Sequence, residues 1–168
     1  MRQQQGITLV ELLISLTILA ILVGVVFPGF QGILARNNIA TGANSVLLAV
    51  NLARGEAVRQ SDPTTLVAID PSDATNVWGP GWQVLTIAAN APDIPCAAPE
   101  CLRQFEGVSD ALTLHSGVNF VQFNSRGGLA AGVPVLIDLC NPGVSGVRVT
   151  ISVVGRASTS DLDAVQCP

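Results

Sequence analysis

The sequence predicts an α+β fold in which a long N-terminal helix packs on an antiparallel β-sheet domain. Two observations support this prediction. An almost uninterrupted apolar run over residues 7–27 continues into a segment of helical periodicity that ends near Gln60. Beyond Pro63, short β-prone runs alternate with turn signals. The rest of the chain is long enough for one modest globular domain.

The apolar run contains a single acid, Glu11. Residues 12–27 carry no charge, and together with residues 7–10 they reach the ~20 residues that a membrane-spanning helix needs. A carboxylate at membrane depth costs roughly 2.5 kcal/mol or more unless it finds a partner, so Glu11 is a candidate functional residue. A secretory signal peptide would have a shorter apolar core followed by a small-residue cleavage site, which this segment lacks.

The helix is expected to have two halves that join around Pro28. Proline removes an intrahelical hydrogen bond, so the junction is expected to bend or melt locally. Beyond it, one face is apolar at spacings of seven, four, three and four residues: Ile39, Val46, Val50, Ala53 and Ala57. Polar residues lie largely on other faces, and three of them are expected to form a solvated face: Arg54, Glu56 and Arg59.

Strands are expected at residues 65–69, 82–87, 111–115, 118–124, 133–139 and 146–154. A loop with proline and cysteine is expected at about 88–101, and a glycine-containing hairpin turn at 125–128. The last expected strand alternates apolar and polar residues, with four apolar residues on one face: Val147, Val149, Ile151 and Val153. The buried face of the helix is expected to pack on this sheet. Trp78 and Trp82 are expected to be core anchors.

The four cysteines all lie beyond the apolar run. An even count in an exported domain favours disulfides, and four cysteines allow three pairings. We favour Cys96–Cys101, which closes a small loop, with Cys140–Cys167 tying the C-terminus to an inner strand. The alternative is a zinc site, but the ligand spacing is poor, with one distant histidine, His115.

Composition argues against several functions. The net charge is −4 and all eight basic residues are arginine, whereas sequence-independent binding of nucleic acid relies on clustered positive charge. Asp110, His115 and Ser116 are residue types found in hydrolytic triads, but no nucleophile elbow, zinc-protease motif, P-loop or dinucleotide fingerprint is present. The sequence predicts neither an enzyme nor a cofactor or metal site.

The N-terminal residues carry a resemblance. The segment from Gly6 to Glu11, followed by Pro28, resembles the class III signal of type IV pilins and type II secretion pseudopilins, although Ile7 replaces the usual phenylalanine. The resemblance implies that prepilin peptidase cleaves after Gly6 and methylates the amine of Ile7. It also implies that Glu11 pairs with this amine on a neighbouring subunit and sets the register of assembly. Residues 1–6 would be the leader, 7–30 the transmembrane and filament-core helix, and 31–168 the amphipathic half-helix with the globular domain.

Four further motifs resemble the FimT, FimU and GspH group of minor pilins and pseudopilins. They are L-x-R-x-E-A-x-R at 52–59, W-x-x-G-W at 78–82, F-x-x-x-G at 123–127 and V-x-I-x-x-x-G-R at 149–156. The resemblance implies a type IV pilin-like fold and a minor pilin that helps initiate or cap a type IV pilus. The precursor would lie in the inner membrane with a periplasmic domain, and its partners would be other pilins and the inner-membrane assembly machinery.

Two alternatives stay open at this point. One is a GspH-like pseudopilin of a type II secretion system. The other is a DNA-binding minor pilin for DNA uptake, because some FimT members bind DNA through a G-R-x-R motif. Only the first two residues of that motif are present here, at 155–156, and Asp161 and Asp163 follow closely. The candidate DNA contacts are Arg126, Arg148 and Arg156.

Overall fold

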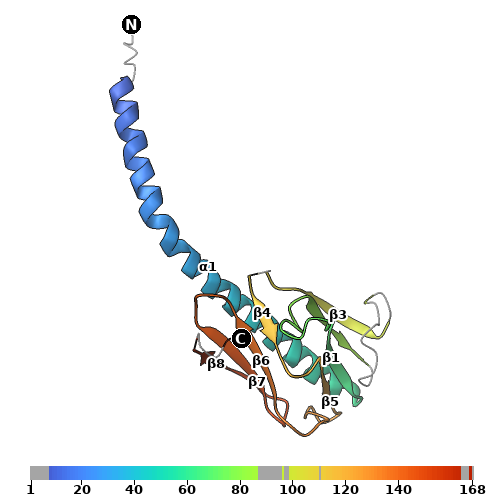
Figure 1. Cartoon of the computed structure of the whole chain (residues 1–168). Coiled ribbons are helices and arrows are strands. Elements are labelled where there is room, and N and C mark those ends of the chain that lie inside the picture. The colour runs from blue at the N-terminus through green and yellow to red at the C-terminus, as the bar shows by residue number, and fades with distance from the viewer. Residues whose placement is uncertain (1–7, 87–95, 97–98, 110, 164–166, 168) are drawn as a thin grey trace. The chain divides into compact units, whose positions relative to one another are not determined.

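The computed structural model describes residues 8–86, 96, 99–109, 111–163 and 167, with the side chains of residues 25–30 excepted (Figure 1). Within these residues it has one helix, α1 (Leu9–Gln60), and eight strands. The strands are β1 (Thr64–Ala68), β2 (Gly81–Leu85), β3 (Cys101–Glu106), β4 (Thr113–His115), β5 (Phe120–Phe123), β6 (Val135–Cys140), β7 (Gly146–Ile151) and β8 (Ala157–Leu162).

The chain divides into two compact units, Met1–Leu34 and Ala35–Pro168. In the first unit, the large apolar side chains of residues 9–23 are 53–76% exposed, so this part of α1 is apolar on all sides and buries none of them. Among the described residues, no helix combines the length and apolar character that membrane crossing requires. The predicted span 7–30 includes Ile7 and the side chains of 25–30, which lie outside the described part.

The backbone of α1 continues through residue 28 without interruption. Of the two outcomes predicted at Pro28, bending or local melting, local melting therefore does not occur. Loss of one amide donor does not break a helix when the turns on both sides keep their own hydrogen bonds.

The second unit contains two antiparallel sheets. The first has the strand order β3-β2-β1-β5 and the second β4-β6-β7-β8. The later turns of α1 lie beside the sheets (Figure 1), and one core joins all three layers. The five helix residues predicted to share an apolar face are all buried: Ile39, Val46, Val50, Ala53 and Ala57. Trp78 and Trp82 are also buried, as predicted.

Two strands were missed by the sequence analysis, β3 and β8. Both lie at the edge of a sheet, and most of their side chains are exposed. An edge strand that buries few side chains has no apolar alternation to reveal it. The two strands are therefore invisible to an argument from periodicity.

The last predicted strand, at residues 146–154, is longer than the strand in the structure. β7 ends at Ile151, and residues 152–155 form a turn into β8, in which the amide of Ser152 donates to the carbonyl of Arg156. Val153, placed on the buried face by alternation, is 42% exposed in this turn. The polypeptide reverses because Gly155 adopts a φ of 76°, which ends the alternation.

Two disulfides join the four cysteines. Cys140 on β6 pairs with Cys167, with 5.6 Å between their Cα atoms, and Cys96 pairs with Cys101 at 4.9 Å. This is the pairing that the sequence favoured among the three. The larger loop brings the chain end back to the second sheet.

Candidate functional site

The N-terminal site is described only in part. Gly6 and Ile7 lie outside the described residues, and so does the side chain of Pro28. Thr8 caps α1, because the amide of Glu11 donates to its Oγ1 at 3.3 Å and the amide of Leu12 donates to its carbonyl at 3.2 Å. Glu11 lies exposed in the first helical turn, where a carboxylate also interacts favourably with the helix dipole.

The two hydroxyl groups of the apolar half-helix are satisfied within the helix. Ser15 donates to the carbonyl of Glu11 at 2.8 Å, and Thr17 donates to the carbonyl of Leu13 at 2.6 Å. Among the described residues 9–23, Glu11 is therefore the one polar side chain without a hydrogen bond to the helix. A charged partner for it has to come from outside the helix.

A second site lies in the globular unit, where Arg54 of α1 reaches the tips of both sheets. Its Nε donates to the carbonyl of Gly127 at 3.1 Å. Gly127 lies in the turn that follows β5, and Gly155 lies in the turn between β7 and β8. We call Arg54 and the two turns 124–128 and 152–156 the arginine clasp.

The two turns of the arginine clasp are in direct contact. The amide of Leu129 donates to the carbonyl of Val153 at 2.8 Å. Gly127 and Gly155 have φ values of 77° and 76°, which L-amino acids with side chains rarely adopt. The predicted turn at 125–128 forms, and the side chain of Asn124 closes it by accepting from the amides of Arg126 and Gly128, but the strands on either side, β5 and β6, lie in different sheets.

The arginine clasp brings together one residue from each of three separated motifs. Arg54 belongs to the motif at 52–59, Gly127 ends the motif at 123–127, and Gly155 belongs to the motif at 149–156. Arg54 was predicted as part of a solvated face, and that prediction is wrong: its side chain is partly buried under the turns. The pattern of residues along the helix does not indicate this contact. The sequence features that could have indicated it are two distant glycines in turn sequences, Gly127 and Gly155.

The three arginines predicted as DNA contacts differ in their surroundings. Arg126 and Arg156 are exposed, and each lies in one of the two turns of the arginine clasp. Arg148 lies on β7 and pairs with Asp138 on β6 through two hydrogen bonds of 2.7 and 2.8 Å. Hydrogen bonding to Asp138 raises the pKa of Arg148. The fold therefore places two of the candidates in turns that touch and pairs the third with a carboxylate.

The other two residues of the predicted polar helix face, Glu56 and Arg59, form an ion pair. Arg59 donates from Nε to Glu56 at 2.9 Å, and Gln60 also donates to Glu56. Hydrogen bonds from Arg59, then from Gln60, lower the pKa of Glu56 to about 2. Because the Arg59 side chain is 68% exposed, solvent screens the pair and limits its contribution to stability.

The tryptophan motif holds the connection between β4 and β5. The indole Nε1 of Trp78 donates to the carbonyl of Val118 at 2.8 Å, and the amide of Trp78 donates to the carbonyl of Leu114. Trp82 stacks on Phe105 of β3 with 6.0 Å between ring centroids, and Arg103 lies over the same Phe105 ring. Both indoles serve packing.

Two of the three residue types found in hydrolytic triads, His115 and Ser116, make hydrogen-bond contacts with backbone carbonyls. His115 Nδ1 lies 2.9 Å from the carbonyl oxygen of Ala74, and Ser116 donates to the carbonyl of Leu136 at 2.7 Å. Asp110 lies outside the described residues. Within the described part of the chain, no group of three or more histidine, cysteine, aspartate or glutamate residues could hold a metal ion.

A long N-terminal helix, apolar on all sides at its start and packed by its later turns on antiparallel sheets, defines a pilin-like protein. The chain belongs to the family of the type II transport protein GspH, whose family model matches residues 42–155. Residues 1–27 match the family model of the prokaryotic N-terminal methylation motif. No curated protein matches the chain.

Solved structures share the fold. The type IV minor pilin FimU of Pseudomonas aeruginosa is 24% identical, with a TM-score of 0.62 over 79% of this chain and 94% of FimU. A second crystal form of FimU has 23% identity and a TM-score of 0.59 over 77% of this chain and 96% of the FimU chain. The match extends through nearly all of the FimU chain, which shows that the fold is shared.

Proposed function

We propose that the protein is a minor pilin, a structural subunit that helps initiate or cap a type IV pilus. The observation that carries the proposal is the presence, in one chain, of the N-terminal methylation motif at 1–27 and the GspH family body at 42–155. The likeness of the fold to FimU supports a pilus subunit.

The proposed maturation acts on residues 1–11. Prepilin peptidase cleaves after Gly6, so that residues 1–6 leave as the leader, and the new amine of Ile7 is methylated. In the assembled filament, Glu11 of one subunit pairs with that amine on its neighbour. Two buried opposite charges offset their desolvation only in good geometry, so the pair favours one register over all others.

The proposed filament core is formed by residues 7–30. The apolar side chains of 9–23 are exposed over the whole helix circumference, and their burial requires lipid or neighbouring subunits. The precursor is proposed to be an inner-membrane protein with residues 31–168 in the periplasm. It then passes into the pilus with help from the assembly machinery and the other pilins.

Processing is tested by replacing Gly6 with valine in the full chain. The expected result is a precursor that keeps its leader, seen as intact Met1 by mass spectrometry, and that does not enter sheared pili. Gly55→Val is the matched control, because residue 55 lies outside the proposed filament core and a Cβ there contacts nothing within 4 Å. Normal cleavage and pilus entry of Gly6→Val would contradict the proposal.

The register role is tested at Glu11. Glu11→Gln keeps the size and polarity of the side chain but removes its charge, so subunits should be processed normally and recovered from pili in much smaller amounts. Recovery of Glu11→Gln at the wild-type level would exclude a role for the charge. Deletion of the gene, scored together for surface pili and protein secretion, separates a pilus subunit from a type II secretion pseudopilin.

DNA binding is a second candidate, favoured by one observation. The arginine clasp places the turns of Arg126 and Arg156 in contact, and phosphate binding uses several cations together. The test is a gel shift with the full chain in detergent. Salt-sensitive binding that is lost in Arg126→Ser with Arg156→Ser, but kept in Arg36→Ser, would support it. No binding at low salt would exclude it.

A further inference from the structure

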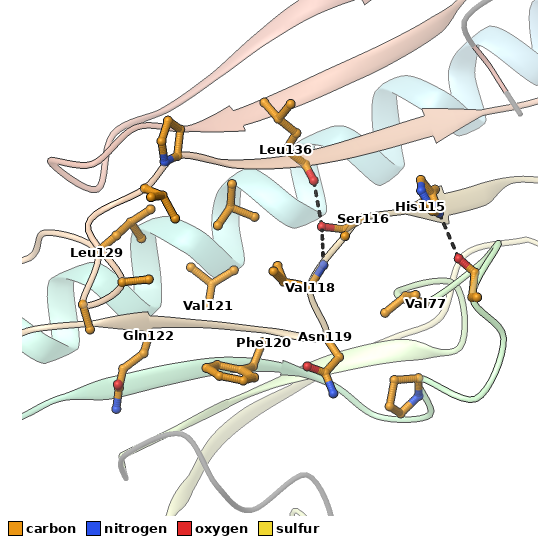
Figure 2. A pocket seen from close by; sticks show the side chains of 18 residues that line it. Val77, His115, Ser116, Val118, Asn119, Phe120, Val121, Gln122, Leu129 and Leu136 are labelled. Atoms are coloured by element: carbon orange, nitrogen blue, oxygen red, sulfur yellow. Dashed lines mark hydrogen bonds between the residues drawn. The ribbon is translucent and has the colours of Figure 1, made fainter.

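A groove of about 1040 Å³ lies between the two sheets, and Gln122 and Leu129, on either side of turn 124–128, are among the residues that line it (Figure 2). Its walls come from the connection between β4 and β5, from β5 itself, and from the segment that leads into β6. Four large apolar side chains of these walls are exposed by 39–58%: Val118, Phe120, Val133 and Leu136. Among the described residues that line the groove, none is Asp, Glu, Lys or Arg.

The groove exposes strand edges from both sheets. β5 is an edge strand, and Asn119 accepts a hydrogen bond from Ala68 of β1. Because backbone groups alternate in direction along an antiparallel strand, the amide and carbonyl of Phe120 point away from β1. On the opposite wall, β4 pairs with β6 only at residues 138–140, and Ser116 occupies the carbonyl of Leu136.

Part of the β5 edge already accepts a strand-like neighbour. The amide of Ala130 donates to the carbonyl of Gln122 at 2.9 Å, and Phe123 forms an antiparallel bridge with Leu129. Of residues 118–121, only Phe120 presents its amide and carbonyl to the groove, because Asn119 and Val121 face β1 and both backbone groups of Val118 are bonded, the amide to Ser116 Oγ and the carbonyl to Trp78 Nε1. An extended segment could prolong this pairing by β-augmentation.

One end of the groove is acidic. Pro71 and Ala74 line it, and the same loop carries Asp70 and Asp73, both exposed. Hydrogen bonds from Ser72 lower the pKa of Asp70, and hydrogen bonds from Thr75 lower the pKa of Asp73, so both are ionised at neutral pH. The groove therefore combines an uncharged apolar body with a negative end.

We propose that this groove binds an extended apolar segment of a neighbouring filament subunit, which pairs with the β5 edge and places a basic residue beside Asp70 and Asp73. The apolar walls select uncharged side chains along the segment, and the acidic loop selects a cation at its end. The inference rests on the proposed function for the source of the segment. It uses a surface that neither processing nor the Glu11 contact requires.

The first test uses the full chain in lipid nanodiscs and a fluorescein-labelled peptide, Arg-Val-Thr-Val-Thr-Val-Arg. The expected result is saturable binding by fluorescence anisotropy, with no binding to empty nanodiscs. The same peptide with glutamate at both ends should bind at least about threefold more weakly. Absence of saturable binding, or equal binding of the two peptides, would overturn the proposal.

Two variants locate the binding. Val118 and Leu102 are both 39% exposed, but Val118 lines the groove and Leu102 lies on β3 at the other edge of its sheet. Val118→Asp should weaken binding by about tenfold, because a charge would be buried under the segment, and Leu102→Asp should leave it unchanged. Asp70→Asn with Asp73→Asn should remove the difference between the two peptides. Equal weakening by Val118→Asp and Leu102→Asp would place the binding elsewhere.

The source of the segment is tested in pilus-producing cells with a photo-crosslinking amino acid at Val133, which is 58% exposed in the groove. A crosslink mapped to a β-prone segment of another pilin supports the proposal, and crosslinks only to non-pilin proteins overturn it. If Gly6 processing and pilus entry are normal while the peptide does not bind, the groove proposal alone is wrong. If Gly6→Val enters pili normally, the proposed function is wrong whatever the groove binds.

Discussion

Gly155 lies against the backbone of Gly127, so that a Cβ on Gly155 would stand 1.9 Å from the carbonyl oxygen of Gly127. The same carbonyl accepts the hydrogen bond from Arg54 Nε. The helix, the turn after β5 and the turn before β8 therefore meet at one carbonyl group. This contact joins the first sheet to the second at the end of the unit where Arg126 and Arg156 lie.

Gly155→Ala is expected to destabilise the protein by about 2–5 kcal/mol. Alanine would have to adopt the positive φ of this position, and its methyl group would force two backbone segments apart. A backbone carbonyl cannot move aside as a flexible side chain can. Gly143→Ala is the matched control: its φ is 84°, and a Cβ there meets nothing within 4 Å. Its expected cost is about 1–2 kcal/mol, from the backbone conformation alone.

The comparison is measured by chemical unfolding of the two variants as full chains in detergent. Gly155→Ala should show the lower midpoint of the two. Equal midpoints would mean that the contact between the turns relaxes at little cost, and the arginine clasp would then be no constraint on the two sheets.

The two tryptophans provide a second prediction, since both are buried but only one indole is bonded. Trp78 Nε1 donates to the carbonyl of Val118, whereas Trp82 Nε1 has no hydrogen-bond partner among the described residues. Replacement by phenylalanine removes similar volume at both positions. Trp78→Phe also leaves the Val118 carbonyl without its donor, so it should cost about 1–3 kcal/mol more than Trp82→Phe.

Thermal unfolding followed by circular dichroism measures this difference, and Trp78→Phe should have the lower Tm. The same pair can be compared for peptide binding in the groove, because Trp78 holds the backbone of Val118. A Trp82→Phe variant that is less stable than Trp78→Phe would show that packing against Phe105 outweighs the hydrogen bond.

The sequence predicts the elements that bury an apolar face. The helix face from Ile39 to Ala57 was read from its spacing, and the inner strands β1, β2, β6 and β7 were placed within two residues at their starting ends. β3 and β8 were missed because edge strands bury little. Apolar periodicity reports burial, so it cannot report a strand held mainly by backbone hydrogen bonds.

The candidate sites also differ in how far the sequence predicts them. The residues at 6–11 are recognised from local spacing, which a sequence records directly. The role of Arg54 depends on Gly127, 73 residues away, and on Gly155 beyond it. Spacing along the helix cannot indicate such a contact, and Arg54 looks like any other arginine on a polar face. Similarly, the pairing of Arg148 with Asp138 depends on the register of β6 and β7.

The two disulfides should differ in their contribution to stability. Cys140–Cys167 spans 27 residues and Cys96–Cys101 spans five. Chain-entropy estimates give about 3.5 kcal/mol for the longer loop and about 2 kcal/mol for the shorter one. The longer disulfide also lies over Gly146, where a Cβ would stand 2.8 Å from Cys167 Sγ.

Paired serine variants test this difference, because replacing both cysteines of one disulfide avoids a free thiol. Cys140→Ser with Cys167→Ser should lower the free energy of unfolding more than Cys96→Ser with Cys101→Ser. The reverse order would indicate that the short loop orders more of the chain than its own length suggests.

The ion pair of Glu56 with Arg59 predicts a dependence of stability on pH. The folded-state pKa of Glu56 is about 2, below its ordinary value of 4.5, because Arg59 and Gln60 donate hydrogen bonds to the charged form. A carboxylate with a lowered pKa stabilises the fold fully above its unfolded-state pKa, and this contribution is lost as the pH falls from about 4.5 towards 2.

Glu56→Gln should therefore lower the Tm at pH 7 by about 1–4 °C, the small effect of a solvent-screened pair. The difference between wild type and Glu56→Gln should shrink steadily below pH 4.5, and it should also shrink at 1 M salt. In an Arg59→Gln background, Glu56→Gln should have a smaller effect at pH 7, whereas an unchanged effect would assign the stabilisation to Gln60.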